Sequence, residues 1–308
     1  MSTTINAQEA GRLMRLATYA STTVAVILIL TKLVAWLSTE SVSLLATLID
    51  SSLDALASLI NLLAVRHALM PADSKHRFGH GKAEALAGLG QATFIAGSAG
   101  FLVLESFNRI IHPQPVGMIG IGIGVMVFSI LATLVLLGFQ RHVIRKTDST
   151  AIKADELHYR TDLMVNGSVI VALVLAHYGW PGFDAVFALG IAAYILYSSW
   201  HIAHEAVQHL MDEELPDEDR QHIMDTVLKH PHVRGMHDLR TRRSGTTYFI
   251  QLHLELDDQL PLIKAHRISD QVETQLQALF PDSEIIIHED PASISEPQPE
   301  FSEEVTAP

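Results

Sequence analysis

Six long apolar stretches occupy the first two thirds of the chain. A bilayer core about 30 Å thick needs roughly 20 mostly apolar residues in a helix, and each stretch comes close to or exceeds that length. The second stretch carries Asp50 and Asp54, and the fifth carries His158, Arg160 and Asp162. The pattern predicts an all-α membrane domain over residues 1–210. Its six helices are expected at Leu16–Leu37, Ser41–Leu69, Ala85–Leu104, Val116–Phe139, Leu157–Tyr178 and Phe183–Trp200, the last continuing to about Leu210.

Basic residues gather on one side of the predicted helices. Short cytoplasmic loops of membrane proteins collect Lys and Arg. The connections on one side have little beyond Arg109, whereas those on the other side hold most of the basic residues of this region. We therefore expect a multi-pass protein with its N- and C-termini in the cytoplasm. The basic residues of the cytoplasmic side are Arg12, Arg15, Arg66, Lys75, Arg77, Lys82, Arg141, Arg145, Lys146 and Lys153.

From residue 211 the pattern changes to that of a small soluble domain. Apolar residues recur at helical spacing in two segments and alternate with polar residues in others, as in Tyr248–Leu256. The order αββαβ predicts an α+β domain over residues 211–292, and the Pro- and Glu-rich residues 293–308 predict a disordered tail. The expected elements are a helix at Asp217–Lys229, strands at Met236–Arg243 and Tyr248–Leu256 around a Ser244-Gly245 turn, a helix opened by Pro261, and a strand at Ile285–His288.

Composition excludes several functions. The formal net charge of -13 argues against nucleic acid as a partner, because a protein that binds phosphates needs a basic face. The chain has no cysteine, which excludes disulfides, thiolate zinc sites and thiol catalysis, so any metal must be bound by nitrogen and oxygen. The HExxH, GxSxG and GxxxxGK motifs of common enzyme classes are also absent. We therefore expect no enzymatic activity.

Two pairs of potential metal ligands lie within the predicted membrane helices. Carboxylates at this depth cost several kcal/mol unless they face a partner or water. Asp50 and Asp54 are four residues apart, as are His158 and Asp162, so each pair lies on one helix face. Three carboxylates and one imidazole suit a four-coordinate ion such as Zn²⁺. The alternative is that these residues form a purely structural polar seam between the two helices. The excess negative charge of three carboxylates and one histidine argues against it, because only a cation or protons can offset that charge. Arg160 points to another face of its helix, and we assign it to the cytoplasmic rim.

Five sequence motifs resemble the cation diffusion facilitator family, in its bacterial zinc-transporting branch. They are SLLATLIDSSLDALASLINL from Ser43, ADSKHRFGHGKAEAL from Ala72, KADELHYRTDLMVNG from Lys153, HDLRTRRSG from His237 and IIIHEDP from Ile285.

This resemblance implies six membrane helices, a cytoplasmic metallochaperone-like domain, a homodimer in the bacterial inner (plasma) membrane, and proton-coupled efflux of divalent metal by antiport. It places Asp50, Asp54, His158 and Asp162 at the transport site. Relatives of this kind often have histidine at the position of Asp50, which leaves Zn²⁺, Cd²⁺ and Fe²⁺ open as substrates. A metal-gated sensor or channel without proton coupling is the alternative function.

The loop after the second predicted helix contains Asp73, His76 and His80. Three ligands with an open position would fit an exchangeable metal site. An ordinary solvated loop explains the spacing equally well, because Asp and His are common in loops. The resemblance favours a second zinc site at these residues.

The soluble domain contains a third group of potential ligands. His253 is expected on the polar face of its strand, and His288 and Asp290 share a face at a spacing of two residues. With His237 and His266 the domain can offer four imidazoles around one bridging carboxylate, which would suit two zinc ions that hold the domains of a dimer together.

One further pair of residues gains a role only from the resemblance. Lys82 and Asp212 match an ion-pair interlock of the dimer. The alternative is two unrelated surface charges, which is the usual role of such residues.

Overall fold

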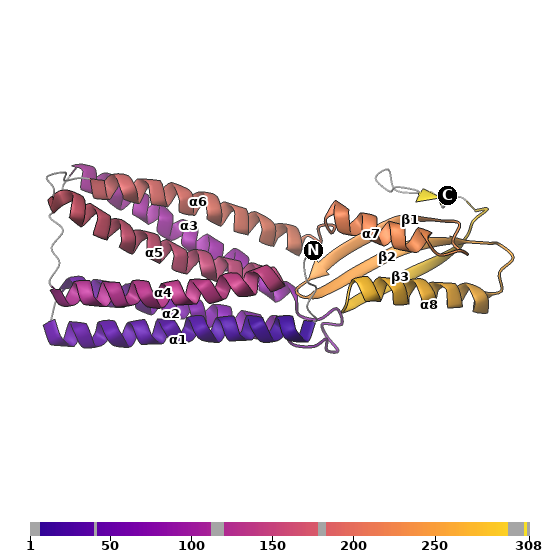
Figure 1. Ribbon diagram of the computed structural model, residues 1–308, viewed down its shortest axis with the longest axis horizontal. Coiled ribbons are helices and arrows are strands. Elements are labelled where there is room, and N and C mark those ends of the chain that lie inside the picture. Colours follow the sequence, from indigo (N-terminus) through magenta and orange to yellow (C-terminus); the bar gives the residue numbers. More distant parts are fainter. Residues whose placement is uncertain (1–6, 40–41, 112–119, 178–182, 295–304, 307–308) are drawn as a thin grey trace. The chain divides into compact units, whose positions relative to one another are not determined.

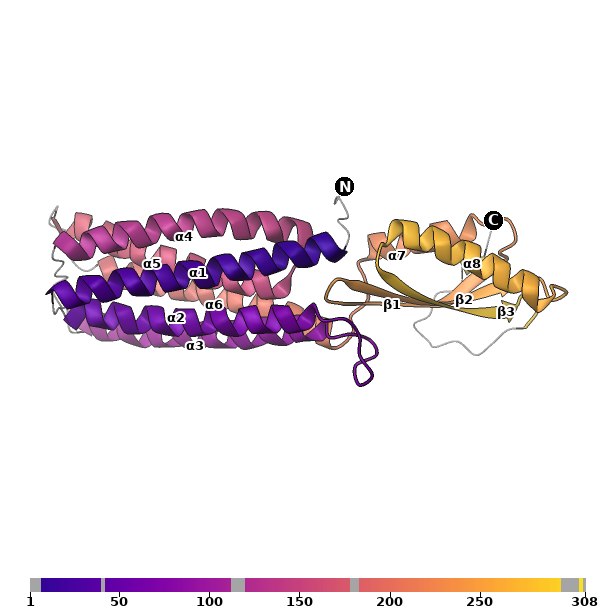
Figure 2. The ribbon, with the colours of Figure 1, turned by 90° about the horizontal axis from the view of Figure 1, so that it is seen from below.

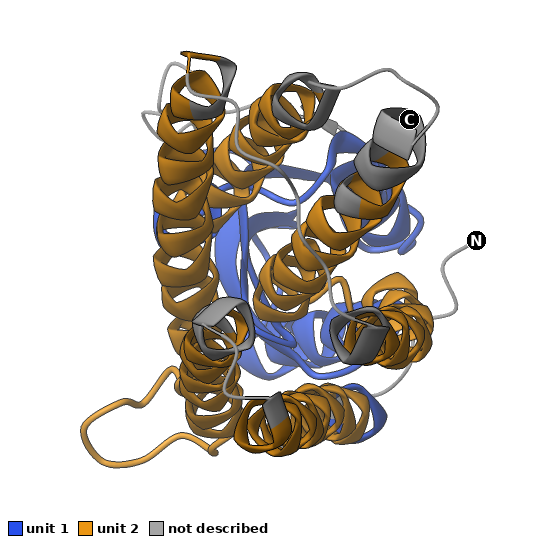
Figure 3. Ribbon diagram, turned by 90° about the vertical axis from the view of Figure 1, so that its left-hand side faces the viewer, with its two compact units in different colours: residues 1–10, 208–308 blue, residues 11–207 orange. Residues whose placement is uncertain are grey.

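A computed structural model describes residues 7–39, 42–111, 120–177, 183–294 and 305–306. The chain divides into two compact units, residues 11–207 and residues 1–10 with 208–308, which are described separately (Figure 3). The expectation of a helical membrane domain followed by a small α+β domain is confirmed.

Six long helices form the first unit and run alongside one another (Figure 2). In the part of the chain that the structure describes, four of them have the length and hydropathy of membrane spans, over Gln8–Ser38, Thr47–Ala68, Lys82–Asn108 and Gly124–Thr147. Large apolar side chains remain exposed along these helices, as expected where lipid replaces water. The helices are α1 (Ala7–Thr39), α2 (Val42–Ala68), α3 (Lys82–Ile111), α4 (Gly120–Thr147), α5 (Thr150–His177) and α6 (Phe183–Leu210).

Helix α5 packs against α2, α3 and α4. Its N-terminal half is buried, with Leu157 fully enclosed, although the same segment carries several charged residues. A glycine on α3 permits the close approach to α5, because a Cβ on Gly88 would lie 2.9 Å from Thr150 Cγ2 and 3.3 Å from Thr150 O. The helix with the lowest expected affinity for lipid is therefore held inside the bundle, where its polar side chains can meet one another.

The second unit is a mixed sheet with two helices on one face (Figure 2). Strands β1 and β2 pair antiparallel, β3 pairs parallel to β2, and the sheet order is β3-β2-β1-β4. Leu252 and Leu254 on β2 are buried among the helices, while His253 between them lies on the opposite face. The elements, labelled in Figure 1, are α7 (Asp217–Leu228), β1 (Gly235–Ser244), β2 (Thr247–Leu256), α8 (Leu262–Leu279), β3 (Ser283–Pro291) and β4 (Val305–Thr306).

Local geometry positions several residues of the sheet. Gly245 in the β1–β2 turn has φ +60°, a conformation that glycine adopts without strain. The β1–β2 register shifts between His237 and Arg240, a bulge in which Asp238 has φ +47°. The two residues of β4 pair with the start of β1. Residues 295–304 and 307–308 lie outside the described residues, so the disordered tail stays a prediction.

Candidate metal-binding sites

Three potential ligands converge inside the helical unit. Asp54 on α2 and His158 and Asp162 on α5 each offer an atom, and these atoms lie within 4.8 Å of one another. His158 Nε2 is 3.1 Å from Asp54 Oδ1 and 3.9 Å from Asp162 Oδ2. This nitrogen is buried and, among the described residues, makes no hydrogen bond of good geometry. A divalent cation would use the lone pair of that nitrogen and offset both carboxylates.

The fourth predicted ligand of this site is Asp50. It lies in α2 one turn before Asp54, as its spacing predicts. Its side chain lies outside the part of the chain that the structure describes. Its role as a ligand therefore stays a prediction.

Buried hydrogen bonds fix α5 against its neighbours beside this cluster. The hydroxyl of Tyr159 lies 2.9 Å from Ser58 Oγ on α2 and donates to Ser21 O on α1 at 3.0 Å. The Asn61 amide donates to the backbone oxygen of Ala151 at 3.5 Å. Ser58 and Asn61 of α2 thus hold α2 against α5. These contacts set the distance between Asp54 and His158.

A second buried carboxylate, Asp155, lies one turn from His158 on α5. Its side chain has no exposed surface and accepts hydrogen bonds from Gln140 Nε2 at 2.8 Å and Gln91 Nε2 at 3.3 Å. Asp155 thereby joins α3, α4 and α5. Spacing along one helix could not reveal the two glutamines, because they lie on other helices.

Arg160 points away from the three ligands. Its guanidinium lies over the ring of Tyr194 on α6, 5.4 Å from the centroid, and its Nε is 3.7 Å from Glu156 Oε2. Glu156 also accepts a hydrogen bond from Arg141 on α4 at 3.0 Å. The positive charge of Arg160 is therefore directed at Glu156.

The loop between α2 and α3 brings Asp73, His76 and His80 together. Their candidate ligand atoms lie close together: His80 Nε2 is 3.2 Å from His76 Nδ1 and 3.3 Å from Asp73 Oδ2, and His76 Nδ1 is 3.4 Å from the other carboxylate oxygen, Asp73 Oδ1. Hydrogen bonds from the backbone N–H groups of His76 and then Lys75 lower the pKa of Asp73 to about 2. The carboxylate is therefore ionised and fixed in place, ready to accept a cation.

A third cluster lies on the face of the sheet opposite the helices. His237 on β1, His253 on β2 and His288 on β3 occupy paired positions of adjacent strands, and Asp290 lies two residues after His288. Asp290 Oδ2 is 2.7 Å from His253 Nδ1 and 3.6 Å from His237 Nε2, and its Oδ1 is 3.2 Å from His288 Nε2. Since the buried Asp290 faces three imidazoles with both oxygens, it is placed to bridge two cations.

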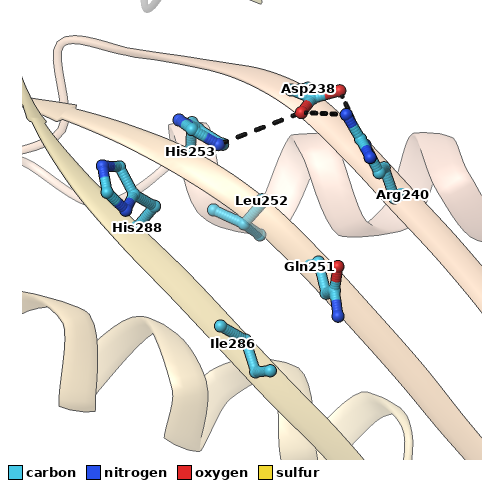
Figure 4. Close-up of a pocket in the computed structure, with 7 residues that line it drawn as sticks. All are labelled: Asp238, Arg240, Gln251, Leu252, His253, Ile286 and His288. Carbon is cyan, nitrogen blue, oxygen red and sulfur yellow. Dashed lines mark hydrogen bonds and ion pairs between the residues drawn. The ribbon is translucent and has the colours of Figure 1, made fainter.

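Two carboxylates that the sequence did not single out lie behind these histidines. Glu255 Oε1 is 2.9 Å from His237 Nδ1, and the bulge residue Asp238 has Oδ2 3.9 Å from His253 Nε2. Arg240 holds Asp238 with two contacts of 2.9 and 3.0 Å, and this pairing raises the pKa of Arg240. Figure 4 shows Asp238, His253 and His288 at a pocket of about 300 Å³. The alternation of β2 could have revealed Glu255, because residues 253 and 255 share a face.

The remaining predicted residues are placed differently. His266 on α8 lies 3.7 Å from Asp270 Oδ2 and is not among the residues of the described chain whose ligand atoms converge with Asp290. Asp212 is paired with Arg242 at 3.2 Å, and Lys82 begins α3. The roles of His266 in a two-zinc site and of Lys82 and Asp212 in a dimer interlock stay predictions.

Comparison with known proteins identifies the class of transporter. Residues 18–211 match the family model described as the cation efflux transmembrane domain, and residues 215–292 match the cytoplasmic domain of cation efflux proteins. The cation-efflux pump FieF of Salmonella agona is 54% identical over 287 residues, and that of Salmonella arizonae is 53% identical; each alignment covers 93% of this chain and 96% of the relative. A solved metal-bound C-terminal domain of the CzcD transporter from Thermotoga maritima is 28% identical, with a TM-score of 0.25, and covers 26% of this chain and 93% of that one.

The two family models lie in the same order as the two units of the structure and together cover most of the chain. The family is one of multi-pass membrane transporters, and the prediction that the protein is not an enzyme agrees with it. The motifs that resembled the cation diffusion facilitators thus led to the right family: the chain belongs to the cation efflux family of transporters.

Proposed function

We propose that the protein exports Zn²⁺ from the cytoplasm in exchange for protons. The observation that carries this proposal is the convergence of Asp54, His158 and Asp162, whose ligand atoms lie within 4.8 Å of one another on two adjacent membrane helices. The buried Nε2 of His158 supports it further, because this nitrogen faces the carboxylates of Asp54 and Asp162 at 3.1 and 3.9 Å, where a cation could bind all three groups. Asp50 would complete a four-ligand site.

Exchange for protons follows from the chemistry of these ligands. Metal binding requires neutral imidazole and ionised carboxylates, so metal and protons compete for the same atoms. In an inward-facing state, the ionised site would capture Zn²⁺ from the cytoplasm. In an outward-facing state, protonation of His158 and of one carboxylate would expel the ion. The inward proton gradient would then drive the cycle.

The ligand set bears on the choice of metal. Three oxygens and one nitrogen form a harder site than one with two imidazoles, and ligand type alone does not select one divalent ion at such a site, so Cd²⁺ and Fe²⁺ are candidates beside Zn²⁺. The relatives named cation-efflux pumps carry a general name that agrees with this breadth. We propose Zn²⁺ as the main substrate, with Cd²⁺ and Fe²⁺ as further candidates.

The other two clusters would act outside the transport path. In this proposal the protein is a homodimer in the bacterial inner membrane, with both termini cytoplasmic. Zinc at Asp290, His237, His253 and His288, with His266, would fasten the two soluble domains together. The cluster at Asp73 would bind zinc near the cytoplasmic end of α2, and the Lys82–Asp212 pair would hold the dimer at its waist.

Metal uptake by proteoliposomes with an imposed pH gradient tests the proposal. Zinc flux should follow the size and direction of the gradient, and Asp54→Ala should abolish it while the protein remains a folded dimer by size-exclusion chromatography. Asp225→Ala, which removes an exposed carboxylate of α7, is the matched control and should leave flux unchanged. Zinc flux that does not depend on the pH gradient would support a channel or sensor instead. Wild-type flux in Asp54→Ala would exclude Asp54 as a ligand of the transport site.

A further inference from the structure

The residues of the loop cluster are separated by distances close to those between the ligands of one zinc ion. For Zn–N and Zn–O bonds of about 2.0–2.1 Å, two ligand atoms of a tetrahedral site lie about 3.3 Å apart. His80 Nε2 is 3.2 Å from His76 Nδ1 and 3.3 Å from Asp73 Oδ2, and His76 Nδ1 is 3.4 Å from Asp73 Oδ1, so each pair of residues is at the separation of two zinc ligands. A tetrahedral site made by one atom of each of these three residues would have one open corner.

A third imidazole lies against His80. His67, in the last turn of α2, has its ring 4.7 Å from the ring of His80, at an interplanar angle of 68°. The ring of His76, whose nitrogen already converges with that of His80, lies at the same centroid distance of 4.7 Å. The rings of His67 and His76 thus lie equally close to the ring of His80. The nitrogens of His67 are not among the ligand atoms that converge here, so ligation by His67 requires its side chain to rotate.

His80 is buried and His67 is exposed, and this difference favours ligation by His67. His80 is buried, and its Nδ1 has no hydrogen-bond partner among the described residues, so its ring is held by packing with Nε2 turned toward the cluster. His67 is exposed, and its backbone is fixed by the helix and by the bond from Met70 N to His67 O at 3.0 Å. Rotation about the two side-chain bonds of His67 can therefore bring a nitrogen to the open corner without moving the backbone.

We propose that His67 is the fourth ligand of the loop site, which makes it a closed site of three imidazoles and one carboxylate. This inference rests on the proposed binding of metal by Asp73, His76 and His80. It changes the expected behaviour of that site, because a site with four protein ligands is typical of structural metals and one with an open position is typical of exchangeable metals. A metal held by His67 also ties the loop to α2, the helix that carries Asp54.

The test uses the full-length protein with the other two clusters disabled by Asp54→Ala and His253→Ala. Zn²⁺ affinity is measured by equilibrium dialysis in this background, in which one ion per protomer is expected at the loop. His67→Ala should raise the Kd at least about tenfold, since even the loss of a group behind a ligand costs 10–100-fold. His222→Ala, an exposed histidine on α7, is the matched control and should change nothing. An unchanged Kd in His67→Ala would overturn the proposal.

A spectroscopic variant reports coordination directly. The chain has no cysteine, so His67→Cys introduces its single thiol. If residue 67 is a ligand, Co²⁺ bound to this variant should show an intense thiolate-to-cobalt charge-transfer band in the near ultraviolet, which His222→Cys should lack. Absence of the band would overturn the proposal, as would full recovery of Zn²⁺ affinity in His67→Gln, because an amide can accept a hydrogen bond from His80 but is a poor ligand.

The outcome also separates this inference from the proposed function. If the background protein binds no Co²⁺ or Zn²⁺, the loop site itself fails, and the role of His67 fails with it. Proton-driven flux through Asp54 and His158 is measured independently and would stand in that case.

Discussion

Replacing Glu255 by alanine tests whether the carboxylate behind His237 supports the cytoplasmic cluster. The His237 Nδ1–Glu255 Oε1 contact is 2.9 Å, and 4% of the His237 side chain and 14% of the Glu255 side chain are exposed. Removing the carboxylate leaves a buried imidazole N–H without its acceptor, which costs about 1–3 kcal/mol. Because 1 kcal/mol shifts the Tm of a domain of about 100 residues by about 4–8 °C, the metal-free domain should melt at least about 4 °C lower.

Zinc adds a second, separable effect. At a free zinc concentration of about 100 times the Kd, bound metal stabilises the native domain by about 2.7 kcal/mol. Loss of a group that orients a ligand weakens affinity about 10–100-fold. At the same zinc concentration, the contribution of the metal then falls to about 1.4 or 0.4 kcal/mol. The rise in Tm on adding zinc should therefore shrink to roughly half or less in Glu255→Ala.

The assay is thermal unfolding of the unit from residue 208 to 308, with and without zinc. This unit has its own buried core, which includes Ile223, Ile250 and Leu276. Glu255→Gln keeps an acceptor for the imidazole N–H and should restore the Tm of the metal-free domain. Glu284→Ala removes an exposed carboxylate of β3 and serves as the control. If Glu255→Ala gains as much stability from zinc as the parent does, Glu255 does not orient a metal ligand.

His158→Ala is expected to weaken metal binding and to flatten the pH dependence of transport, because imidazole titrates nearest neutrality; an unchanged profile across a pH series would assign the proton role to the carboxylates. Asp50→His should shift preference toward Zn²⁺ over Cd²⁺, measured as the ratio of transport rates, and an unchanged ratio would contradict the role of Asp50 in selectivity. Since backbone hydrogen bonds lower the pKa of Asp73 from 3.8 to about 2, this carboxylate stays ionised as the pH falls from 3.8 to about 2, so proton competition at Asp73 should not be what releases Co²⁺ from the loop above about pH 3; equal pH profiles of Co²⁺ release for Asp73→Asn and the parent protein above that pH would agree with this, and a profile shifted only in the parent between about pH 3 and 4 would contradict it. The double variant His253→Ala/Asp290→Ala should lose the zinc-dependent rise in Tm and form a weaker dimer, while its transport rate falls only in part. Complete loss of transport with an unchanged melting curve would show that these residues act in the translocation step.

Periodicity along the chain was sufficient to predict the helices of both units and strands β1 to β3, but not the two-residue strand β4, which lies in the segment that composition predicted to be a disordered tail. The long apolar stretches predicted the membrane helices, because the thickness of a bilayer sets the number of apolar residues that must follow one another. The alternation in Tyr248–Leu256 predicted β2 to within one residue, since adjacent side chains of a strand point to opposite faces. The helix ends were predicted less well: α1 begins at Ala7 rather than near Leu16, because a helix continues beyond the apolar region wherever its backbone hydrogen bonds can be made.

Ligand pairs within one helix or one loop could also be derived from the sequence. Asp50 with Asp54 and His158 with Asp162 share a helix face by their spacing of four. Asp73, His76 and His80 lie within one short loop, where few residues separate them. The sequence therefore determined which residues of each segment can act together, because local geometry is fixed by backbone periodicity.

Only the tertiary structure decided which segments meet. The packing of α5 against α2 brings His158 within 3.1 Å of Asp54, and the folding of the loop back onto α2 brings His67 against His80. The β1–β2 register and the bulge decide that Glu255 lies behind His237 and Asp238 near His253. These contacts depend on helix packing, strand register and a left-handed bulge residue. No spacing along a single element contains that information, because the partner lies on another element whose position is set by the packing of the whole unit.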